Sequence, residues 1–226
     1  PALVDVSTTI QPGEFVGIVG KPGSGQSTIF KLLLQLQPAE RDSLFIAGHD
    51  VMDLDLGQLR RSIAYVPSNS YLLSSSIADN ITFGSDTLPH VSVREAATRA
   101  DLYRDLGAQL DYPLKILKED GKDLSGGQKQ RINIARGFYK NASYLLLDDC
   151  FSALDPITVT NVLTSLRGVK EQTILCISQR LEVTKQADRI LVVDEGKLVE
   201  EGTHDTLMAL NGLYAELYTA QEGAQA

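Results

Sequence analysis

Runs of apolar residues alternate with amphipathic segments along most of the chain. Glu14–Val19, Tyr144–Leu147 and Gln172–Ile177 are short runs dominated by Val, Ile and Leu. Such runs are typical of strands that are buried on both faces of a sheet. Ile29–Leu36 and Ala96–Leu110 carry apolar residues at helical spacing, which predicts helices. The alternation predicts an open α/β fold with a mostly parallel sheet.

Weaker patterns predict the remaining elements. Leu44–Ala47 and Ala64–Pro67 have the composition of short strands, and a glycine turn follows the first. Ile190–Val193 and Leu198–Glu200 predict a hairpin near the C-terminus, followed by a helix to about Tyr218. The last six residues are predicted to be a disordered tail.

Three stretches carry residues that begin helices. Ser125–Gln128 fits the S-x-x-Q capping box, and Ser92–Glu95 fits its S-x-x-E form. Asp155 before Pro156 combines an N-cap residue with a proline in the first turn. The helix that starts after Ser125 exposes backbone N–H groups at its positive end, and its two glycines let an anion approach closely.

Candidate chemistry follows two of the predicted strands. Residues 20–28, GKPGSGQST, lie between a strand and a helix, which is the context of a phosphate-binding P-loop. The N–H groups of this loop would surround phosphates, and Ser27 would offer its hydroxyl to Mg²⁺. Asp148 and Asp149 follow a buried strand at its carboxyl end, where open α/β sheets place their ligands. Taken alone, the first stretch could be a plain glycine-rich turn and the second a solvated acidic turn.

The composition is ordinary for a globular protein, with an acidic balance. Of 226 residues, 43% are hydrophobic and 22% are charged, and the formal net charge is −8. This charge, without a long basic block, argues against nucleic acid as a partner. Cys150 and Cys176 are too few for a disulfide framework and lie in strand-like contexts, which favours buried thiols. No apolar stretch is long enough to span a bilayer, and because the chain starts at Pro1 we expect a fragment of a longer protein.

The stretch Leu124–Asp155 resembles the ABC-transporter ATPase family. It contains LSGGQ, a hydrophobic strand, an acidic pair and an S-A-L-D turn, in the order of that family's signature region. The resemblance covers most of the chain and implies a single domain with a P-loop NTPase (RecA-like) core, formed by residues 1–68 and 140–226. It also implies a small antiparallel β subdomain and an inserted α-helical subdomain at residues 69–139.

The resemblance further implies residues that bind ATP and Mg²⁺. Ser27 and Asp148 would hold the metal, and two such domains would pair head to tail, each signature closing over the other's P-loop. The residues expected at the domain's own nucleotide site are Gly20, Lys21, Pro22, Gly23, Ser24, Gly25, Gln26, Ser27 and Thr28. The residues expected to contact the partner's nucleotide are Leu124, Ser125, Gly126, Gly127, Gln128 and Asp155.

Four positions depart from the residues that carry hydrolysis in the family. Gln26 replaces a lysine whose charge-assisted phosphate contact is worth about 1.5–3 kcal/mol. Ser68 stands where a glutamine would reach the metal and the attacking water, and it is too short to do so. Asp149 replaces the general-base glutamate and sets the carboxylate back by about 1 Å, a displacement that can cost ~10²-fold in rate. Gln179 replaces a histidine that touches the γ-phosphate, and it cannot share charge with the transferring group.

Two further stretches resemble segments of the family, but none of the three histidines lies where the family places its catalytic histidine. Ser75–Ile81 is similar to the segment after the family's Q-loop, and Glu119–Gly121 is similar to a glutamate-containing loop of exporters or is a plain charged turn. His49, His90 and His204 lie away from the Gln179 position, and we expect them at the surface.

An impaired site beside an intact signature is typical of one half of an asymmetric pair. The leading interpretation is the degenerate nucleotide-binding domain of a heterodimeric ABC exporter, at the cytoplasmic face of a membrane. Its partners would be a second, non-identical nucleotide-binding domain and the transmembrane domain. One alternative is an active homodimeric ATPase in which Lys21 and Asp149 have taken over the lost roles. Another is a nucleotide-sensing module that is not attached to a transporter.

Overall fold

The computed structural model describes residues 3–83, 91–112, 123–169 and 171–225. Its strands are β1 (Phe15–Val19), β2 (Phe45–Ile46), β3 (His49–Asp50), β4 (Ile63–Val66), β5 (Tyr144–Asp148), β6 (Thr173–Ile177), β7 (Arg189–Asp194) and β8 (Lys197–Gly202). Its α-helices are α1 (Gln26–Leu33), α2 (Leu56–Ser62), α3 (Ile77–Thr82), α4 (Val93–Arg99), α5 (Tyr103–Leu106), α7 (Gly126–Lys140), α8 (Pro156–Arg167), α9 (Leu181–Thr184), α10 (His204–Leu210) and α11 (Leu213–Gln225). Two short 3₁₀ helices are η1 (Val51–Asp53) and η2 (Gly107–Gln109).

Six strands form one sheet in the order β4-β5-β6-β1-β7-β8. The first five of these run parallel, and β8 pairs antiparallel with β7. β2 and β3 form a separate two-stranded antiparallel hairpin. The predicted α/β fold, with a mostly parallel sheet and a small antiparallel β unit, is therefore confirmed. In a parallel sheet the carboxyl ends of neighbouring strands share one edge, so the loops that follow β1, β4, β5 and β6 lie close together.

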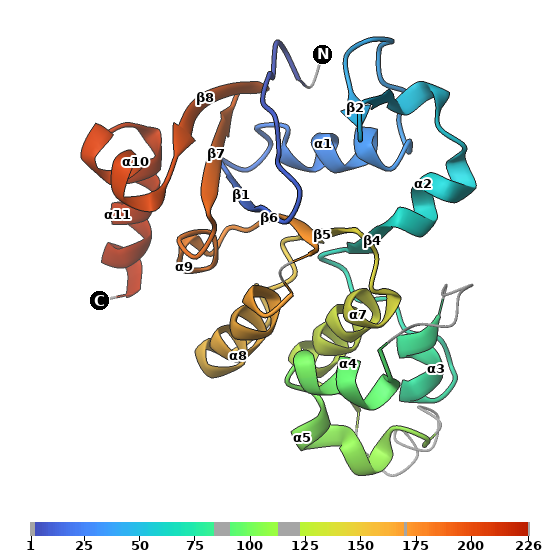
Figure 1. Ribbon diagram of the computed structural model, residues 1–226. Helices are drawn as coiled ribbons and strands as arrows, with labels where there is room; N and C mark the ends of the chain where they lie inside the picture. Colours follow the sequence, from blue (N-terminus) through green and yellow to red (C-terminus); the bar gives the residue numbers. More distant parts are fainter. Residues whose placement is uncertain (1–2, 84–90, 113–122, 170, 226) are drawn as a thin grey trace.

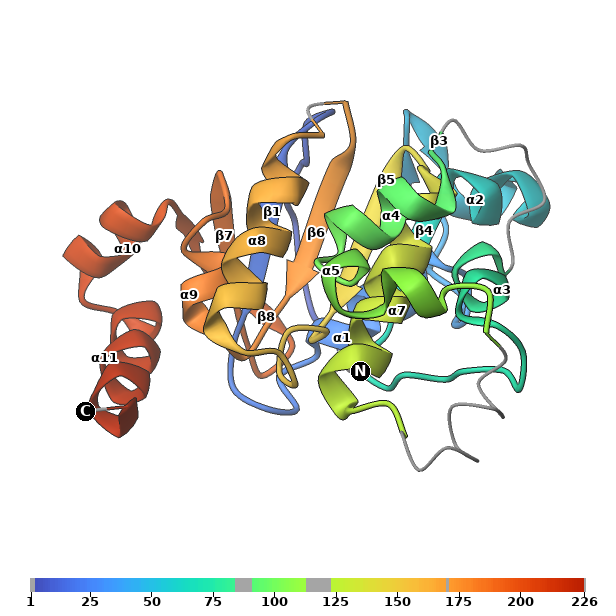
Figure 2. The same ribbon diagram turned by 90° about the horizontal axis from the view of Figure 1, so that it is seen from below.

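Alternate residues of the central strands pack into two separate cores. Val16 and Ile18 of β1 join the core that also contains Phe30 of α1. Phe15 and Val19 of the same strand face the opposite core, which contains residues of α7, α8 and α9. Figure 1 shows α1 on one side of the sheet and these three helices on the other, and Figure 2 looks onto the side that α7 and α8 cover. Burial on both faces explains why the strands are almost wholly apolar.

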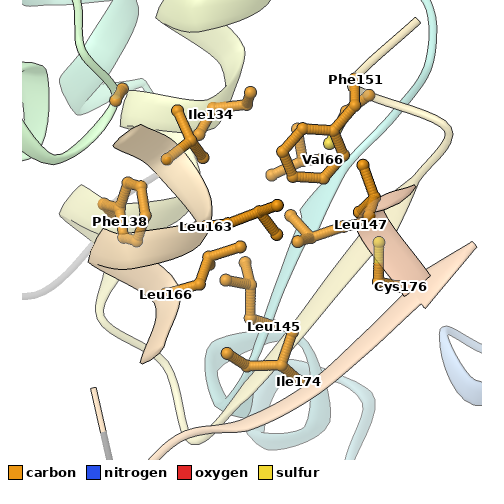
Figure 3. Packing of buried hydrophobic residues seen from close by; sticks show 14 of the residues in the cluster. Val66, Ile134, Phe138, Leu145, Leu147, Phe151, Leu163, Leu166, Ile174 and Cys176 are labelled. Carbon is orange, nitrogen blue, oxygen red and sulfur yellow. The ribbon is translucent and has the colours of Figure 1, made fainter. Parts of the chain in front are cut away.

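The larger core joins α7 and α8 to the sheet. Figure 3 shows Phe138 of α7 and Leu163 of α8 packed around Leu145 and Leu147 of β5. Gly137 lies where α7 meets the sheet, and a Cβ atom there would come within 2.7 Å of the Val66 side chain. α3 and α4 pack against α7 on the side away from this contact. α7 thus packs against α3 and α4 and also belongs to the layer that covers the sheet.

Several predicted helix limits were wrong, for local reasons. α1 ends at Leu33 because Gln35 adopts a left-handed conformation with φ 49°. The helix predicted for Ala96–Leu110 is broken at Asp101, which has φ 53°, and continues as the short helices α5 and η2. Ser92 caps α4 by accepting from the Glu95 N–H, but the Glu95 carboxylate pairs with Arg99 at 2.6 Å and does not complete a capping box.

The C-terminal region is more ordered than the sequence predicted. Instead of one helix to about Tyr218 and a disordered tail, α10 ends at the left-handed Asn211, and α11 runs from Leu213 to Gln225. Tyr214 at the start of α11 is fully buried, and Tyr218 packs against the same core. A helix docked through two aromatic rings keeps its following turns ordered.

No helix among the described residues is both long enough and apolar enough to cross a bilayer. Both cysteines are buried free thiols, as predicted. Cys176 lies in β6, whereas Cys150 lies in the turn after β5 and not in a strand. His49 is exposed, but His204 is half-buried and lies 2.9 Å from the Tyr214 hydroxyl, so the surface prediction was wrong for that residue. His90 and Glu119–Gly121 lie outside the described residues.

Candidate nucleotide-binding site

The loop between β1 and α1 has the geometry of an anion cradle. Gly25 is the N-cap residue of α1 and has φ 107°, a left-handed conformation that favours glycine. No side chain caps the helix, and its first turn contains no acidic residue. The first N–H groups of α1 therefore remain available to a ligand, next to the positive end of the helix dipole.

Two buried polar side chains in this loop have no partner among the described residues. The Ser24 Oγ and the Gln26 Nε2 make no hydrogen bond, although the two residues are only 5% and 6% exposed. Because an unsatisfied buried donor costs free energy, such atoms indicate a group that the protein is built to bind. Both atoms can donate a hydrogen bond, and they belong to residues at the uncapped start of α1, which fits a phosphate. Lys21, by contrast, is exposed.

Asp148, the last residue of β5, is held by hydrogen bonds from two directions. The Ser27 hydroxyl donates to its Oδ1 at 3.1 Å, and the Tyr65 hydroxyl donates to its Oδ2 at 2.9 Å. Burial, the hydrogen bond to Asp148 and the charge of Asp148 raise the pKa of the Tyr65 phenol, so Tyr65 remains a neutral donor. Ser27 and Asp148 thus bring a hydroxyl and a carboxylate oxygen together, and oxygen ligands of this kind suit Mg²⁺.

Asp149 follows β5 in a left-handed backbone conformation. Its φ is 49°, and its N–H donates to the Ile177 carbonyl at 2.8 Å. Its Oδ1 accepts a hydrogen bond from the Gln179 N–H at 3.1 Å. Burial, which is the main cause, and the nearby Asp148 charge raise the pKa of the Asp149 carboxyl, although the Gln179 N–H opposes this shift. The carboxylate is therefore engaged by the loop that follows β6.

The loop after β4 contains Ser68, which is exposed. This loop is braced by Gln130 of α7, whose Nε2 donates to the Pro67 carbonyl at 3.1 Å. The Ser70 hydroxyl donates to the Oε1 of the same Gln130 side chain. The loop is thus fixed by α7, and at position 68 it presents only a short hydroxyl.

The loop after β6 is fixed by contacts on several sides. Gln179 is exposed, and the next residue, Arg180, donates to the Phe151 carbonyl at 3.1 Å and to the Leu154 carbonyl at 2.6 Å. These bonds tie the loop after β6 to the turn after β5.

Leu124–Gln128, hereafter the signature tip, forms the start of α7. The Ser125 hydroxyl accepts from the Gln128 N–H at 3.1 Å and the Gln128 Oε1 accepts from the Ser125 N–H at 2.9 Å, so the predicted capping box is confirmed. Leu124 packs against the core, while Ser125 and Gly126 are exposed. A Cβ atom at Gly126 would meet nothing within 4 Å, so the tip is open to an approaching group.

The turn before α8 contacts the signature tip. A Cβ atom at Gly127 would lie 3.0 Å from the Ala153 carbonyl, which explains the need for glycine at this close approach. Asp155 caps α8 as predicted, with its Oδ1 accepting from the Thr158 N–H at 3.0 Å. These bonds to Thr158 lower the pKa of the exposed Asp155 carboxyl. One carboxylate oxygen of Asp155 also accepts from the Thr158 hydroxyl at 2.7 Å.

A family model described as ABC transporter matches residues 3–152, which include the phosphate loop, the signature tip and both aspartates. The chain belongs to the ABC transporter family. It is 41% identical over 222 residues to an ATP-dependent lipid A-core flippase of Saccharophagus degradans, covering 98% of this chain and 38% of the relative. It is 39% identical over 228 residues to a probable multidrug resistance ABC transporter ATP-binding/permease protein of Bacillus subtilis, covering 98% of this chain and 39% of the relative.

A solved structure of a bacterial Atm1-family ABC exporter with ATP bound superimposes on the ABC domain with a TM-score of 0.87. It is 37% identical and covers 98% of this chain and 39% of the other. The chain therefore spans about two-fifths of the length of these relatives. It is homologous to the ATP-binding domains of ABC exporters.

The ABC domain also contains site residues that the sequence did not single out. Tyr65 is one, although its position in β4 could have revealed it. It pairs in register with Leu146 of β5, so Tyr65 and Asp148 lie on the same face of neighbouring strands. Arg180 and Gln221 are two more, and no local pattern marks them because their partners are distant in the sequence.

Proposed function

We propose that this chain is the nucleotide-binding domain of an ABC exporter that binds MgATP at its own site but hydrolyses it poorly. Its signature tip completes the ATPase site of a second, non-identical nucleotide-binding domain. The cycle of ATP binding and release between the two domains drives export through a transmembrane domain. The chain lies at the cytoplasmic face of that membrane.

The orphaned donors support nucleotide binding at the chain's own site. Ser24 Oγ and Gln26 Nε2 are buried without partners in a loop that offers free helix N–H groups. The phosphates of ATP would satisfy these donors, and Ser27 with Asp148 would hold the Mg²⁺ that neutralises phosphate charge. A neutral amide at position 26 makes the contact weaker than an ammonium would.

One observation carries the proposal of weak hydrolysis: the Asp149 carboxylate accepts the Gln179 N–H. A general base must reach the proton that it abstracts, directly or through one water. The side chain of an aspartate is one methylene shorter than that of a glutamate. Asp149 also has a left-handed backbone conformation, and its carboxylate is bound by the Gln179 N–H in the loop after β6. Gln179, which follows, cannot supply the positive charge that stabilises a phosphoryl transition state.

The openness of the signature tip supports a role in a partner's site. Its Ser125 hydroxyl accepts from Gln128 yet keeps its own proton to donate, and Gly126 leaves space beside it. The capping box engages the N–H groups of Ser125 and Gln128, and the exposed Gly126 between them carries no side chain. Such a helix start is suited to an anion that a second molecule brings.

Steady-state ATPase activity tests this proposal when the chain is assayed alone and again with its natural partner. We expect activity near background for the chain alone and at least about tenfold more for the pair. A matched control mixes the chain with a second copy of itself at the same total concentration. Vigorous turnover by the chain alone would contradict the proposal and favour an active homodimer, in which Asp149 is the base.

A further inference from the structure

The backbone of the segment Ser178–Glu182, hereafter the β6 exit segment, is hydrogen-bonded by side chains from distant parts of the chain. The Gln179 N–H is bound by Asp149 at 3.1 Å, as described above. The carbonyl of the same residue, which belongs to the next peptide unit, is bound from α11. There, the Gln221 Nε2 donates to the Gln179 carbonyl at 2.7 Å, and the Gln221 Oε1 accepts from the Leu181 N–H at 2.8 Å.

Gln221 binds the β6 exit segment as a neighbouring peptide group would. Its amide uses one donor and one acceptor, and it meets a carbonyl and an N–H that lie two residues apart. This pairing fixes the orientation of the amide and leaves neither end free to rotate. The side chain is half-buried, so water competes only partly for these bonds.

α11 is held in place independently of Gln221. One turn earlier, the Tyr218 hydroxyl accepts from the Lys185 Nζ at 3.3 Å, and Tyr214 is fully buried in the core. Lys185 follows α9 directly, so α11 contacts the chain on both sides of α9. Gln221 is therefore presented by a docked helix and not by a loose tail.

These contacts form a continuous chain from the phosphate loop to the C-terminal helix. Ser27 binds Asp148, Asp149 is its neighbour, Asp149 binds the N–H of Gln179, and Gln221 binds the carbonyl of Gln179. With both polar groups of its backbone bound, Gln179 keeps only its exposed side chain free to meet a ligand at this edge of the sheet.

We propose that Gln221 is a positioning residue that couples α11 to the nucleotide site. By fixing the main chain of Gln179 and Leu181, it sets where the Gln179 side chain meets the terminal phosphate of a bound nucleotide. This inference rests on the proposed binding of MgATP. It predicts that Gln221 contributes to the affinity for a triphosphate and not to the affinity for a diphosphate.

The test uses the full protein in which this chain occurs, with Gln221→Leu and Gln221→Glu as variants. Leucine removes both hydrogen bonds, whereas glutamate keeps the acceptor for the Leu181 N–H and loses the donor to the Gln179 carbonyl. Glu222→Gln is the matched control, because Glu222 is the exposed neighbour on the same helix. Amide hydrogen exchange of Leu181 and dissociation constants for MgATP and MgADP are measured for each protein.

For Gln221→Leu, we expect exchange at Leu181 to become about five- to tenfold faster, which is the loss of one hydrogen bond. The ratio of the MgADP to the MgATP dissociation constant should fall about threefold or more, with MgADP affinity unchanged. Gln221→Glu should keep Leu181 protected but lower the same ratio. Glu222→Gln should match the wild type in every measurement.

Unchanged Leu181 exchange in Gln221→Leu would overturn the proposal, and so would equal weakening of both nucleotides, which indicates general destabilisation. A wild-type protein that binds neither nucleotide would contradict the proposed function. The two failures are distinguishable because amide exchange is measured without nucleotide, where unchanged exchange counts against Gln221 alone.

Discussion

The phosphate loop side of this ABC domain and its signature tip use their polar groups in opposite ways. Around the phosphate loop, Asp148 is bound by Ser27 and Tyr65, and Asp149 is bound by Gln179. At the signature tip the polar groups satisfy one another locally, and the surface beyond Gly126 is open. In the first region the carboxylates are bound by other groups of the domain, whereas in the second the start of α7 is exposed. This difference is consistent with the asymmetric pair of sites that we propose.

The signature tip offers the largest predicted effect. In the assembled transporter, Ser125→Arg should lower ATPase activity ~10²-fold or more, because it places bulk and a misplaced charge where the partner's phosphates would bind. The capping bond to Gln128 is also lost, so unfolding is measured alongside. The control is Thr219→Arg, which adds the same side chain at an exposed position on α11. An equal loss of ATPase activity in Thr219→Arg would contradict a specific role of the signature tip.

The phosphate loop offers the next largest effect. Gln26→Lys should lower the dissociation constant for MgATP about tenfold or more, because an ammonium replaces a neutral amide among phosphate oxygens. Isothermal titration calorimetry measures this change, and Gln37→Lys adds the same charge at an exposed position beyond α1. A gain in Gln37→Lys equal to that in Gln26→Lys would show that general charge and not the loop is responsible.

Tyr65→Phe should have a smaller effect, which is confined to the inward-facing region. The variant keeps the ring that packs edge-on against Phe30, with centroids 6.3 Å apart, and removes only the hydroxyl that binds Asp148. We expect a loss of about 1–2 kcal/mol in the free energy of unfolding, measured in urea. The Mg²⁺ concentration needed for ATP binding should shift, because Asp148 loses its second donor. Tyr71→Phe, at an exposed ring, should change neither quantity.

Asp149→Asn should have the smallest effect, and it depends on pH. The pKa of this carboxyl is raised in the folded state, so its ionisation favours unfolding as the pH rises above its ordinary pKa of about 4. Asparagine removes that cost and keeps an oxygen for the Gln179 N–H. The variant should therefore gain less than about 1 kcal/mol of stability at pH 7, and the gain should vanish below about pH 4. Thermal unfolding across this range measures it, and a gain that persists in acid would contradict the assignment.

Local sequence patterns predicted much of the fold and part of the site. The strands β1, β5 and β6 were visible as apolar runs because both of their faces are buried. The Ser125 capping box and the Asp155 N-cap depend on residues three apart, and both were confirmed. The pairing of Ser27 with Asp148 was expected from the resemblance, and the two side chains lie 3.1 Å apart.

The remaining features depend on contacts that no local pattern encodes. The prediction that Asp149 is a weak base did not include its bond to the Gln179 N–H, which joins the segments that follow two neighbouring strands. The sequence did not predict that residues 221–225 are helical, because the packing of Tyr214 and the hydrogen bonds of Gln221 link α11 to distant segments. The break at Asp101 was missed because apolar spacing does not report a single left-handed residue.

The central claim is that hydrolysis depends on this chain's signature tip and not on its own carboxylate. The most direct measurement is the steady-state ATPase activity of the assembled transporter that carries Asp149→Ala. The account predicts that this variant keeps activity within about twofold of the wild type, because the base that matters belongs to the partner domain. A loss of ~10²-fold or more, in a variant that still folds and assembles, would contradict it.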